Sequence, residues 1–180
     1  MVIVQKLHIL VFGVSGSGKS TVAAKLAQAL NAEFIEGDDH HPKSNILKMS
    51  KGQPLTDRDR APWLASLSTI AKQSNKEICV ISCSALKKQY RDFFRHELPN
   101  LILVSLEGGR DVILSRIQNR NGHFMPTSLL GSQLAEYEAP TIEENSFRFS
   151  ILCSPNEIVT DAVDKISSRL NLALGSQENE

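Results

Sequence analysis

Cysteine, excess charge of either sign and long apolar runs are all scarce in this sequence. The three cysteines, Cys79, Cys83 and Cys153, are odd in number and lack metal-type spacing, so we expect reduced thiols. Lys plus Arg and Asp plus Glu are each 20, and this zero net charge gives no support for a nucleic-acid or acidic-membrane partner. No apolar run approaches the roughly 20 residues that span a bilayer. These features predict a cytoplasmic protein without a nucleic-acid or membrane partner.

The sequence also lacks internal repeats, low-complexity tracts and any linker that would divide it. Its 180 residues, 41% of them hydrophobic, suit one compact domain. We expect that domain to cover residues 1–174, followed by a polar tail over residues 175–180. The segment from Met1 to Phe12 is apolar but short, has no small-residue cleavage site and runs into a glycine loop. We therefore interpret it as a first strand and not as a signal peptide.

Short apolar runs alternate along the chain with segments of helical periodicity. The runs predict strands over Leu7–Phe12, Ala32–Glu36, Ile78–Ser82, Leu101–Leu106 and Phe147–Cys153. Helices are predicted from Ser20 to about Leu30 and over Ser44–Ser50, Ala85–Glu97, Arg110–Gln118, Ser128–Glu138 and Asn156–Leu172. One further helix is predicted to have Pro62 in its first turn and to run to about Ser74, with Asp59 as a possible cap. This alternation is typical of a parallel sheet covered by helices on both faces.

A phosphate-binding motif follows the first predicted strand. Residues Gly13–Ser20 match G-x-x-x-x-G-K-[ST] between a strand and a helix. Its glycines let backbone N–H groups turn toward phosphate oxygens, and the following helix adds its positive end. Lys19 supplies a charge for the β- and γ-phosphates and Ser20 a hydroxyl for Mg²⁺. The candidate nucleotide-binding residues are Gly13, Ser15, Gly16, Ser17, Gly18, Lys19, Ser20 and Thr21, although helix packing is the favoured role of Thr21.

A carboxylate follows the second predicted strand. Asp38 would lie at the carboxyl end of a strand beside the phosphate loop, where ligands bind in such folds. It could orient an acceptor hydroxyl and take its proton, which a kinase of small alcohols requires. A surface turn is the alternative, because Gly and Asp are common turn residues.

Basic residues further along the chain could bind an anionic acceptor. Either Arg58 or Arg60 could clamp a carboxylate, but from the residues alone an exposed ion-pair patch with the neighbouring aspartates is favoured. Lys87 and Arg91 are four residues apart, so we expect them on one helix face that could hold an anionic substrate. A solvated basic face is the alternative there.

A lid is expected after the helix that ends at Gln118. Arg116 and Arg120 could be brought over the transferring phosphate, and closure of the lid would exclude water. Gly122 permits a hinge-like change of backbone angles, and His123 follows it. An ordinary cationic helix C-terminus is the alternative.

Taken together, these segments resemble the thermoresistant-type gluconokinase family, a branch of the small P-loop kinases akin to shikimate and adenylate kinases. The matching residues occur in family order across residues 8–140. They are Gly13–Ser20, Glu36–Asp38, His41–Pro42, Asn45, Lys48–Met49, Gly52, Pro54–Leu55, Asp57, Asp59–Arg60, Pro62–Leu64, Cys83–Lys88, Tyr90–Asp92, Gly122–Phe124, Leu129–Leu130, Gln133 and Pro140.

The resemblance implies transfer of the ATP γ-phosphate to the 6-hydroxyl of D-gluconate, with Mg²⁺ as cofactor, as a step of gluconate degradation. It implies a three-layer α/β P-loop fold with a five-stranded parallel sheet, a lid over about residues 119–138, and a homodimer. By position, the implied catalytic residues are Asp38, Lys19 and Arg120, and Ser20 is the implied metal ligand. The implied substrate-binding residues are His41, Arg60, Ser84, Lys87, Arg91 and His123, together with Asp38, and the implied nucleotide and lid arginines are Arg116 and Arg120.

Two other functions stay open at this point. One is another small-molecule P-loop kinase, of shikimate or nucleotide type, and the other is a non-catalytic ATP-binding module. A GTPase switch is disfavoured because the sequence contains no guanine-reading Asn-Lys-x-Asp run.

Overall fold

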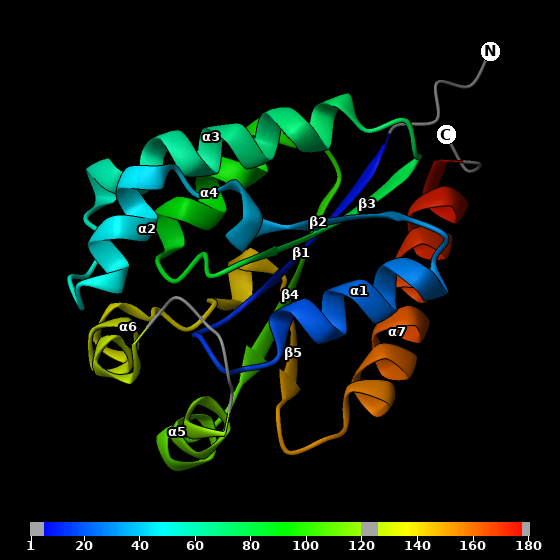
Figure 1. Cartoon of the computed structure of the whole chain (residues 1–180). Coiled ribbons are helices and arrows are strands. Elements are labelled where there is room, and N and C mark those ends of the chain that lie inside the picture. The colour runs from blue at the N-terminus through cyan, green and yellow to red at the C-terminus, as the bar shows by residue number, and fades with distance from the viewer. Residues whose placement is uncertain (1–5, 120–125, 178–180) are drawn as a thin grey trace.

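A parallel sheet lies between layers of helices in the computed structural model, which describes residues 6–119 and 126–177 (Figure 1). Its strands are β1 (Leu7–Phe12), β2 (Glu33–Glu36), β3 (Ile78–Cys83), β4 (Leu101–Glu107) and β5 (Phe147–Ser150). All pairings are parallel, in the order β2-β3-β1-β4-β5. The predicted five-stranded parallel sheet is therefore confirmed, with β5 ending at Ser150 instead of Cys153.

Helices and 3-10 turns connect the strands. The helices are α1 (Lys19–Ala29), α2 (Lys43–Ser50), α3 (Asp57–Gln73), α4 (Lys88–Glu97), α5 (Arg110–Gln118), α6 (Leu130–Glu136) and α7 (Pro155–Gln177). The 3-10 turns are η1 (Gly37–His40), η2 (Thr127–Leu129) and η3 (Ile142–Glu144). Within the described ranges, no helix combines the length and the hydrophobicity that crossing a membrane requires.

The central strand β1 has every residue buried, because helices cover both of its faces. Ile9 and Val11 join a core formed with residues of α1 and α7, whereas Leu10 and Phe12 join a second core formed with α3 and α4. This alternation follows from the two-residue period of a strand. It gives the loop after Phe12 a rigid base at the centre of the sheet.

Helix α3 begins earlier than predicted. Its N-cap is Thr56, whose side chain accepts a hydrogen bond from the Asp59 amide, and the Asp59 carboxylate in turn accepts one from the Thr56 backbone N–H. This capping box satisfies donors at the start of the helix, so Asp59 acts within the cap instead of preceding it. Pro62 consequently lies inside α3 and not in its first turn.

Other predicted boundaries also shift. Helix α4 begins at Lys88 and not at Ala85, because Ala85 adopts a left-handed backbone conformation with φ of 37°. The helix predicted over Ser128–Glu138 is the turn η2 followed by the short α6. Helix α7 continues past the predicted end at Leu172 to Gln177, so part of the predicted polar tail extends the helix.

Candidate functional site

The phosphate loop connects β1 to α1 and is rich in backbone conformations that favour glycine. Gly13 and Gly16 have φ of 152° and 80°. A Cβ atom at Gly13 would lie 2.7 Å from the Leu106 carbonyl oxygen, and one at Gly16 would lie 2.6 Å from Ile117 Cγ1. Both glycines are thus required by conformation and by close packing. The Lys19 ammonium donates to the Val14 carbonyl at 3.2 Å, across the turn of the loop.

The nucleotide-side cavity opens over this loop and encloses about 410 Å³. Its lining contains seven of the predicted nucleotide-binding residues: Ser15, Gly16, Gly18, Lys19, Ser20, Thr21 and Arg116. Asp38, Asn119 and Pro155 complete it. Gly13 and Ser17 do not line this cavity, and Ser17 is buried within the loop. Arg116 also donates a hydrogen bond of 2.6 Å to the Ile151 carbonyl, which holds it beside the start of α7.

A second, smaller cavity of about 40 Å³ lies on the acceptor side. The predicted site residues in its lining are Ser15, Lys19, Asp38, His41, Arg60 and Ser84. Residues Met49, Pro54, Leu55, Trp63, Leu129, Ser132 and Gln133 close it. Because Ser15, Lys19 and Asp38 line both cavities, the phosphate loop and the acidic side chain meet where the two cavities adjoin.

Asp38 is positioned by the turn η1, which follows β2 at the edge of the sheet where the parallel strands end. The Glu36 carboxylate caps this turn by accepting the Asp38 amide at 3.3 Å, and it also accepts the Ser82 hydroxyl at 2.8 Å. The Trp63 indole N–H donates to the Gly37 carbonyl at 2.8 Å. These contacts tie the turn to both β3 and α3, so Asp38 projects from a well-held backbone.

His41 stacks on Trp63, with ring centroids 3.9 Å apart and an interplanar angle of 19°. Burial lowers the pKa of His41 to about 4; nearby Asp38 raises the pKa and Arg60 lowers it. The imidazole is therefore neutral at neutral pH, and its 4.0 Å contact with Asp38 is not an ion pair there. A neutral ring can both donate and accept hydrogen bonds, which suits a polyhydroxylated ligand.

Arg60, and not Arg58, faces the acceptor cavity. Arg60 is buried, and it donates to Glu136 at 2.7 Å and to the Tyr90 hydroxyl at 3.1 Å. Burial alone would lower the pKa of Arg60, but the hydrogen bond to Glu136 and the charges around it raise the pKa. Arg58 is exposed on the same helix. The predicted ion-pair patch does not form, since Arg60 is buried and Asp57 and Asp59 pair with lysines elsewhere.

Lys87 and Arg91 do not line either cavity, and a substrate contact by Lys87 stays a prediction. Lys87 is the N-cap residue of α4, and its ammonium pairs with Asp57 at 2.6 Å. That contact with Lys87, aided by Tyr90 and Gln89, holds the pKa of the Asp57 carboxyl well below its usual range. The pair turns the Lys87 charge toward α3.

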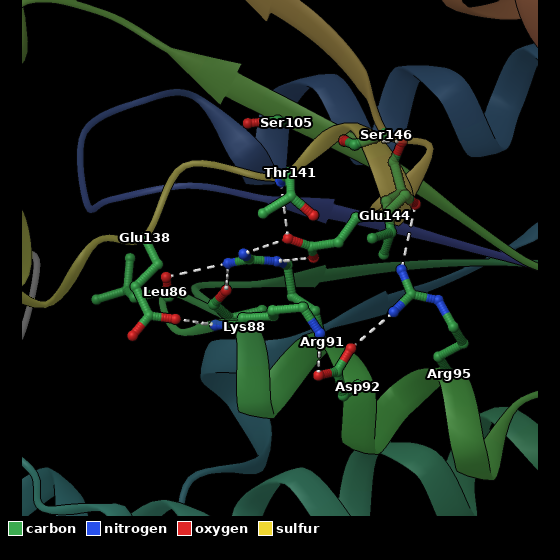
Figure 2. A network of polar contacts seen from close by, with 12 residues as sticks. Leu86, Lys88, Arg91, Asp92, Arg95, Ser105, Glu138, Thr141, Glu144 and Ser146 are labelled. Atoms are coloured by element: carbon green, nitrogen blue, oxygen red, sulfur yellow. Dashed lines mark hydrogen bonds and ion pairs between the residues drawn. The ribbon is translucent and has the colours of Figure 1, made fainter.

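Arg91 is fully buried and points toward the sheet (Figure 2). Its guanidinium pairs with both Glu144 carboxylate oxygens, at 2.6 and 2.9 Å, and donates to the Ala85 and Leu86 carbonyls at 3.1 and 3.0 Å. All of these partners belong to the protein, so Arg91 holds chain segments together. The prediction that Arg91 contacts the substrate is therefore wrong. The four-residue spacing from Lys87 indicated a shared helix face, but it could not show that Arg91 is buried against the protein.

The remaining predictions divide into two groups. Arg120 and His123 lie outside the described residues, as do the central residues of the predicted lid, so their roles stay predictions. The Cys83 thiol is buried, and burial raises its pKa to about 12, which fits the structural role expected for it.

The sequence placed α6 within the predicted lid but gave its individual residues no role in the acceptor site. Leu129, Ser132 and Gln133 line the acceptor cavity, and Glu136 binds Arg60. Their spacing of three and four residues places them on one helix face. That spacing was present in the sequence, but it does not say whether such a face meets a core or a cavity.

Comparisons with known proteins agree with this geometry. A family profile described as an AAA domain matches residues 9–140. The thermoresistant gluconokinase of Escherichia coli K12 is 44% identical over 163 residues, which cover 88% of this chain and 93% of that protein. The crystal structure of a gluconokinase from Sinorhizobium meliloti 1021 matches with a TM-score of 0.83 at 45% identity, over 95% of this chain and 97% of that one.

A more distant structure shares the fold alone. Shikimate kinase from Aquifex aeolicus matches with a TM-score of 0.59 at 17% identity, over 91% of this chain and 98% of that one. The arrangement of the sheet and helices is thus shared with shikimate kinase, and the extensive identity to gluconokinases is far more specific. This chain belongs to the gluconokinase family.

Proposed function

We propose that this chain transfers the γ-phosphate of ATP to the 6-hydroxyl of D-gluconate, giving 6-phospho-D-gluconate and ADP. The observation that carries the proposal is the junction of the two cavities, which Ser15, Lys19 and Asp38 line together. A triphosphate held by the loop would extend toward this junction, and an acceptor hydroxyl beside Asp38 would meet it there. Positioning and charge stabilisation supply most of the catalysis in phosphoryl transfer.

Each residue at the junction has a separate role in the proposal. Asp38 accepts the proton of the 6-hydroxyl as the O–P bond to the γ-phosphorus forms and the bond to the ADP oxygen breaks. Lys19 balances charge on the phosphates. Arg60 offers a cation to the gluconate carboxylate, and His41 and Ser84 offer hydrogen bonds to its hydroxyls.

Magnesium is the proposed metal cofactor. The Ser20 hydroxyl lines the nucleotide cavity one residue after Lys19, which is where a P-loop presents an oxygen to the ion. Mg²⁺ prefers oxygen ligands and keeps several waters, so Ser20, phosphate oxygens and water suit it. The ion would neutralise charge on the β- and γ-phosphates.

We propose that the acceptor cavity widens to admit its ligand. Its volume is about 40 Å³, against about 410 Å³ for the nucleotide-side cavity. Helix α6, which has seven residues, forms one wall of this cavity through Ser132 and Gln133. We propose that this wall belongs to a lid over about residues 119–138, and that the protein is a cytoplasmic homodimer. The family resemblance supports the lid and the homodimer, and the cysteine usage supports the cytoplasmic location.

An acceptor screen tests the proposal directly. Purified protein with ATP and Mg²⁺ is assayed for ADP release with gluconate, shikimate, glycerol and nucleoside monophosphates. We expect gluconate to be the best acceptor by a wide margin, and phosphorus NMR should identify a 6-phosphate ester. A better rate with shikimate or a nucleotide would overturn the substrate but not the kinase reaction. Tight ATP binding without turnover on any acceptor would favour the non-catalytic binding module.

A further inference from the structure

One hydrogen bond joins the phosphate loop to the opposite wall of the acceptor cavity. The backbone N–H of Ser15 donates to the side-chain oxygen of Gln133 at 2.7 Å, across 118 residues of sequence. Ser15 lies in the phosphate loop, whereas Gln133 lies on α6. Both line the acceptor cavity. The side-chain amide of Gln133 is therefore directed at the loop that is expected to hold phosphate.

The position of Ser15 indicates which phosphate of a bound nucleotide would lie nearest to this hydrogen bond. Gly16, Gly18 and Ser20 line the nucleotide cavity alone, whereas Ser15 lines both cavities. Ser15 thus lies at the acceptor end of the loop. A polyphosphate that runs along the loop toward the acceptor would bring its terminal phosphate, and not its inner ones, next to the Ser15 N–H.

A terminal phosphate and Gln133 compete for the same donor. One N–H makes one good hydrogen bond, and a charged phosphate oxygen is a roughly twofold stronger acceptor than a neutral amide oxygen. The phosphate should therefore take the N–H from Gln133. The displaced amide still has an NH₂ group with two donors, which a neighbouring phosphate oxygen can accept.

We propose that Gln133 is a further catalytic residue of the phosphoryl-transfer site. In the nucleotide-free protein its amide oxygen accepts the Ser15 N–H. When a nucleoside triphosphate binds, the γ-phosphate takes that N–H, and the Gln133 NH₂ group donates to the γ-phosphoryl group as it is transferred. The inference uses the proposed function only in taking ATP as the nucleotide, and it does not depend on gluconate as the acceptor.

The face of helix α6 that carries Gln133 also contacts the acceptor side of the site. Glu136, three residues after Gln133, binds Arg60 at 2.7 Å, so the same face of α6 also meets the cation on the acceptor side. The Ser132 hydroxyl is used within the helix, where it donates to the Leu129 carbonyl at 2.8 Å. Among the polar α6 side chains of the acceptor cavity, Gln133 is the one with a measured contact to the phosphate loop.

The test compares nucleotides that differ by the γ-phosphate. Gln133→Glu keeps the shape of the side chain but exchanges the NH₂ group for a negative oxygen. We expect affinity for the non-hydrolysable β,γ-imido analogue of ATP to fall about tenfold or more, because like charges in contact repel. ADP lacks the γ-phosphate, so its affinity should change less than about threefold. Isothermal titration calorimetry without any acceptor measures both values.

Two controls keep the result interpretable. Gln73→Glu adds the same charge at an exposed position of α3 and should alter neither affinity. Gln133→Ala removes both the competing oxygen and the donating NH₂ group, so the ATP analogue should bind at least as tightly as to the wild type. Single-turnover transfer to the best acceptor should nevertheless slow by about 100-fold, as with loss of an oxyanion donor.

Equal losses for ADP and the ATP analogue in Gln133→Glu, or no loss for either, would overturn the proposal. So would an unchanged transfer rate in Gln133→Ala. If no sugar acid is phosphorylated but the variant still separates the two nucleotides, the proposed substrate fails and the role of Gln133 at the γ-phosphate stands.

Discussion

At the scale of single residues, the site depends on side chains whose chemistry is set by what surrounds them. Asp38 takes its place from η1, and His41 takes its neutral state from burial against Trp63. The buried Arg60 cation is paired with Glu136 at 2.7 Å. Residue type alone would not distinguish these groups from the many exposed aspartates, histidines and arginines of an ordinary surface.

The roles of Lys19 and Asp38 can be separated by substitution. Lys19→Ala removes the cation of the phosphate loop and should weaken binding of ATP and ADP. Asp38→Asn keeps the size of the side chain but cannot accept the proton, so we expect kcat to fall by about 100-fold or more with nucleotide affinity nearly unchanged. Steady-state kinetics measure kcat, and calorimetry measures nucleotide affinity. Asp111→Asn, at an exposed position of α5, is a matched control. A near-normal kcat for Asp38→Asn would remove Asp38 as the base.

His41 should make the stability of the protein depend on pH. Its pKa is near 6.5 in the unfolded chain and about 4 in the folded protein. Between these values the unfolded chain binds a proton that the folded protein does not, so the free energy of unfolding falls as the pH falls from 6.5 to 4. The loss has an upper limit of about 3.5 kcal/mol, at about 1.4 kcal/mol per pKa unit.

His41→Phe tests this dependence, because phenylalanine can stack on Trp63 but cannot titrate. Urea unfolding at pH 7 and at pH 4.5 should show a smaller loss for the variant than for the wild type. Asp38 and Arg60 also face this ring and are present in both proteins, so the difference isolates the imidazole. Exposed His96→Gln should leave the dependence unchanged. Identical pH dependence in wild type and His41→Phe would contradict a buried neutral His41.

At the scale of elements, the buried pair of Arg91 and Glu144 joins α4 to the chain between α6 and β5 (Figure 2). The Arg91 guanidinium also lies 5.0 Å from the centre of the Phe12 ring, at the end of β1. Burial alone would raise the pKa of Glu144, but hydrogen bonds from Arg91 and the Thr141 amide outweigh it and lower the pKa. One ion pair thereby joins two segments that lie far apart in the sequence.

Removing one partner of this pair should lower the free energy of unfolding far more than removing both. Arg91→Met leaves the Glu144 carboxylate buried without its cation, and we expect a loss of about 3–5 kcal/mol in the free energy of unfolding. Arg91→Met with Glu144→Met fills the space with apolar groups and should recover much of that loss. Urea unfolding measures the cycle, and Lys88→Met, in an exposed pair on the same helix, should cost under about 1 kcal/mol. Additive losses would contradict the expected coupling.

The elements themselves were largely predictable, and the reasons differ from one element to the next. Buried parallel strands such as β1 and β3 are near-continuous apolar runs, which the sequence displays directly. The start of α4 was not predictable, because the left-handed backbone at Ala85 is imposed by the loop that Arg91 holds. Whether a helix face meets solvent, core or cavity depends on packing, which explains the wrong place given to Arg91 and the missing role of Gln133.

At the scale of the whole molecule, the site gathers residues from distant parts of the chain. The phosphate loop follows β1, Asp38 follows β2, Arg60 lies on α3, and Gln133 lies on α6. The sequence predicted the edge of the sheet where these meet, because the carboxyl ends of parallel strands share one side. It did not predict the volume of either cavity, which depends on how α6 lies against the loop.

Because the site spans these elements, nucleotide binding should stabilise the entire fold. A ligand that binds the folded protein alone raises the free energy of unfolding by about 2.7 kcal/mol at 100 times its Kd. For a chain of this size, that corresponds to a rise in Tm of roughly 5–10 °C. ATP and ADP should each produce it when compared at equal multiples of their own Kd, measured by calorimetry with Mg²⁺ present. Lys19→Ala should lose the rise at the same nucleotide concentration, whereas a rise unchanged in Lys19→Ala would place the nucleotide outside the phosphate loop.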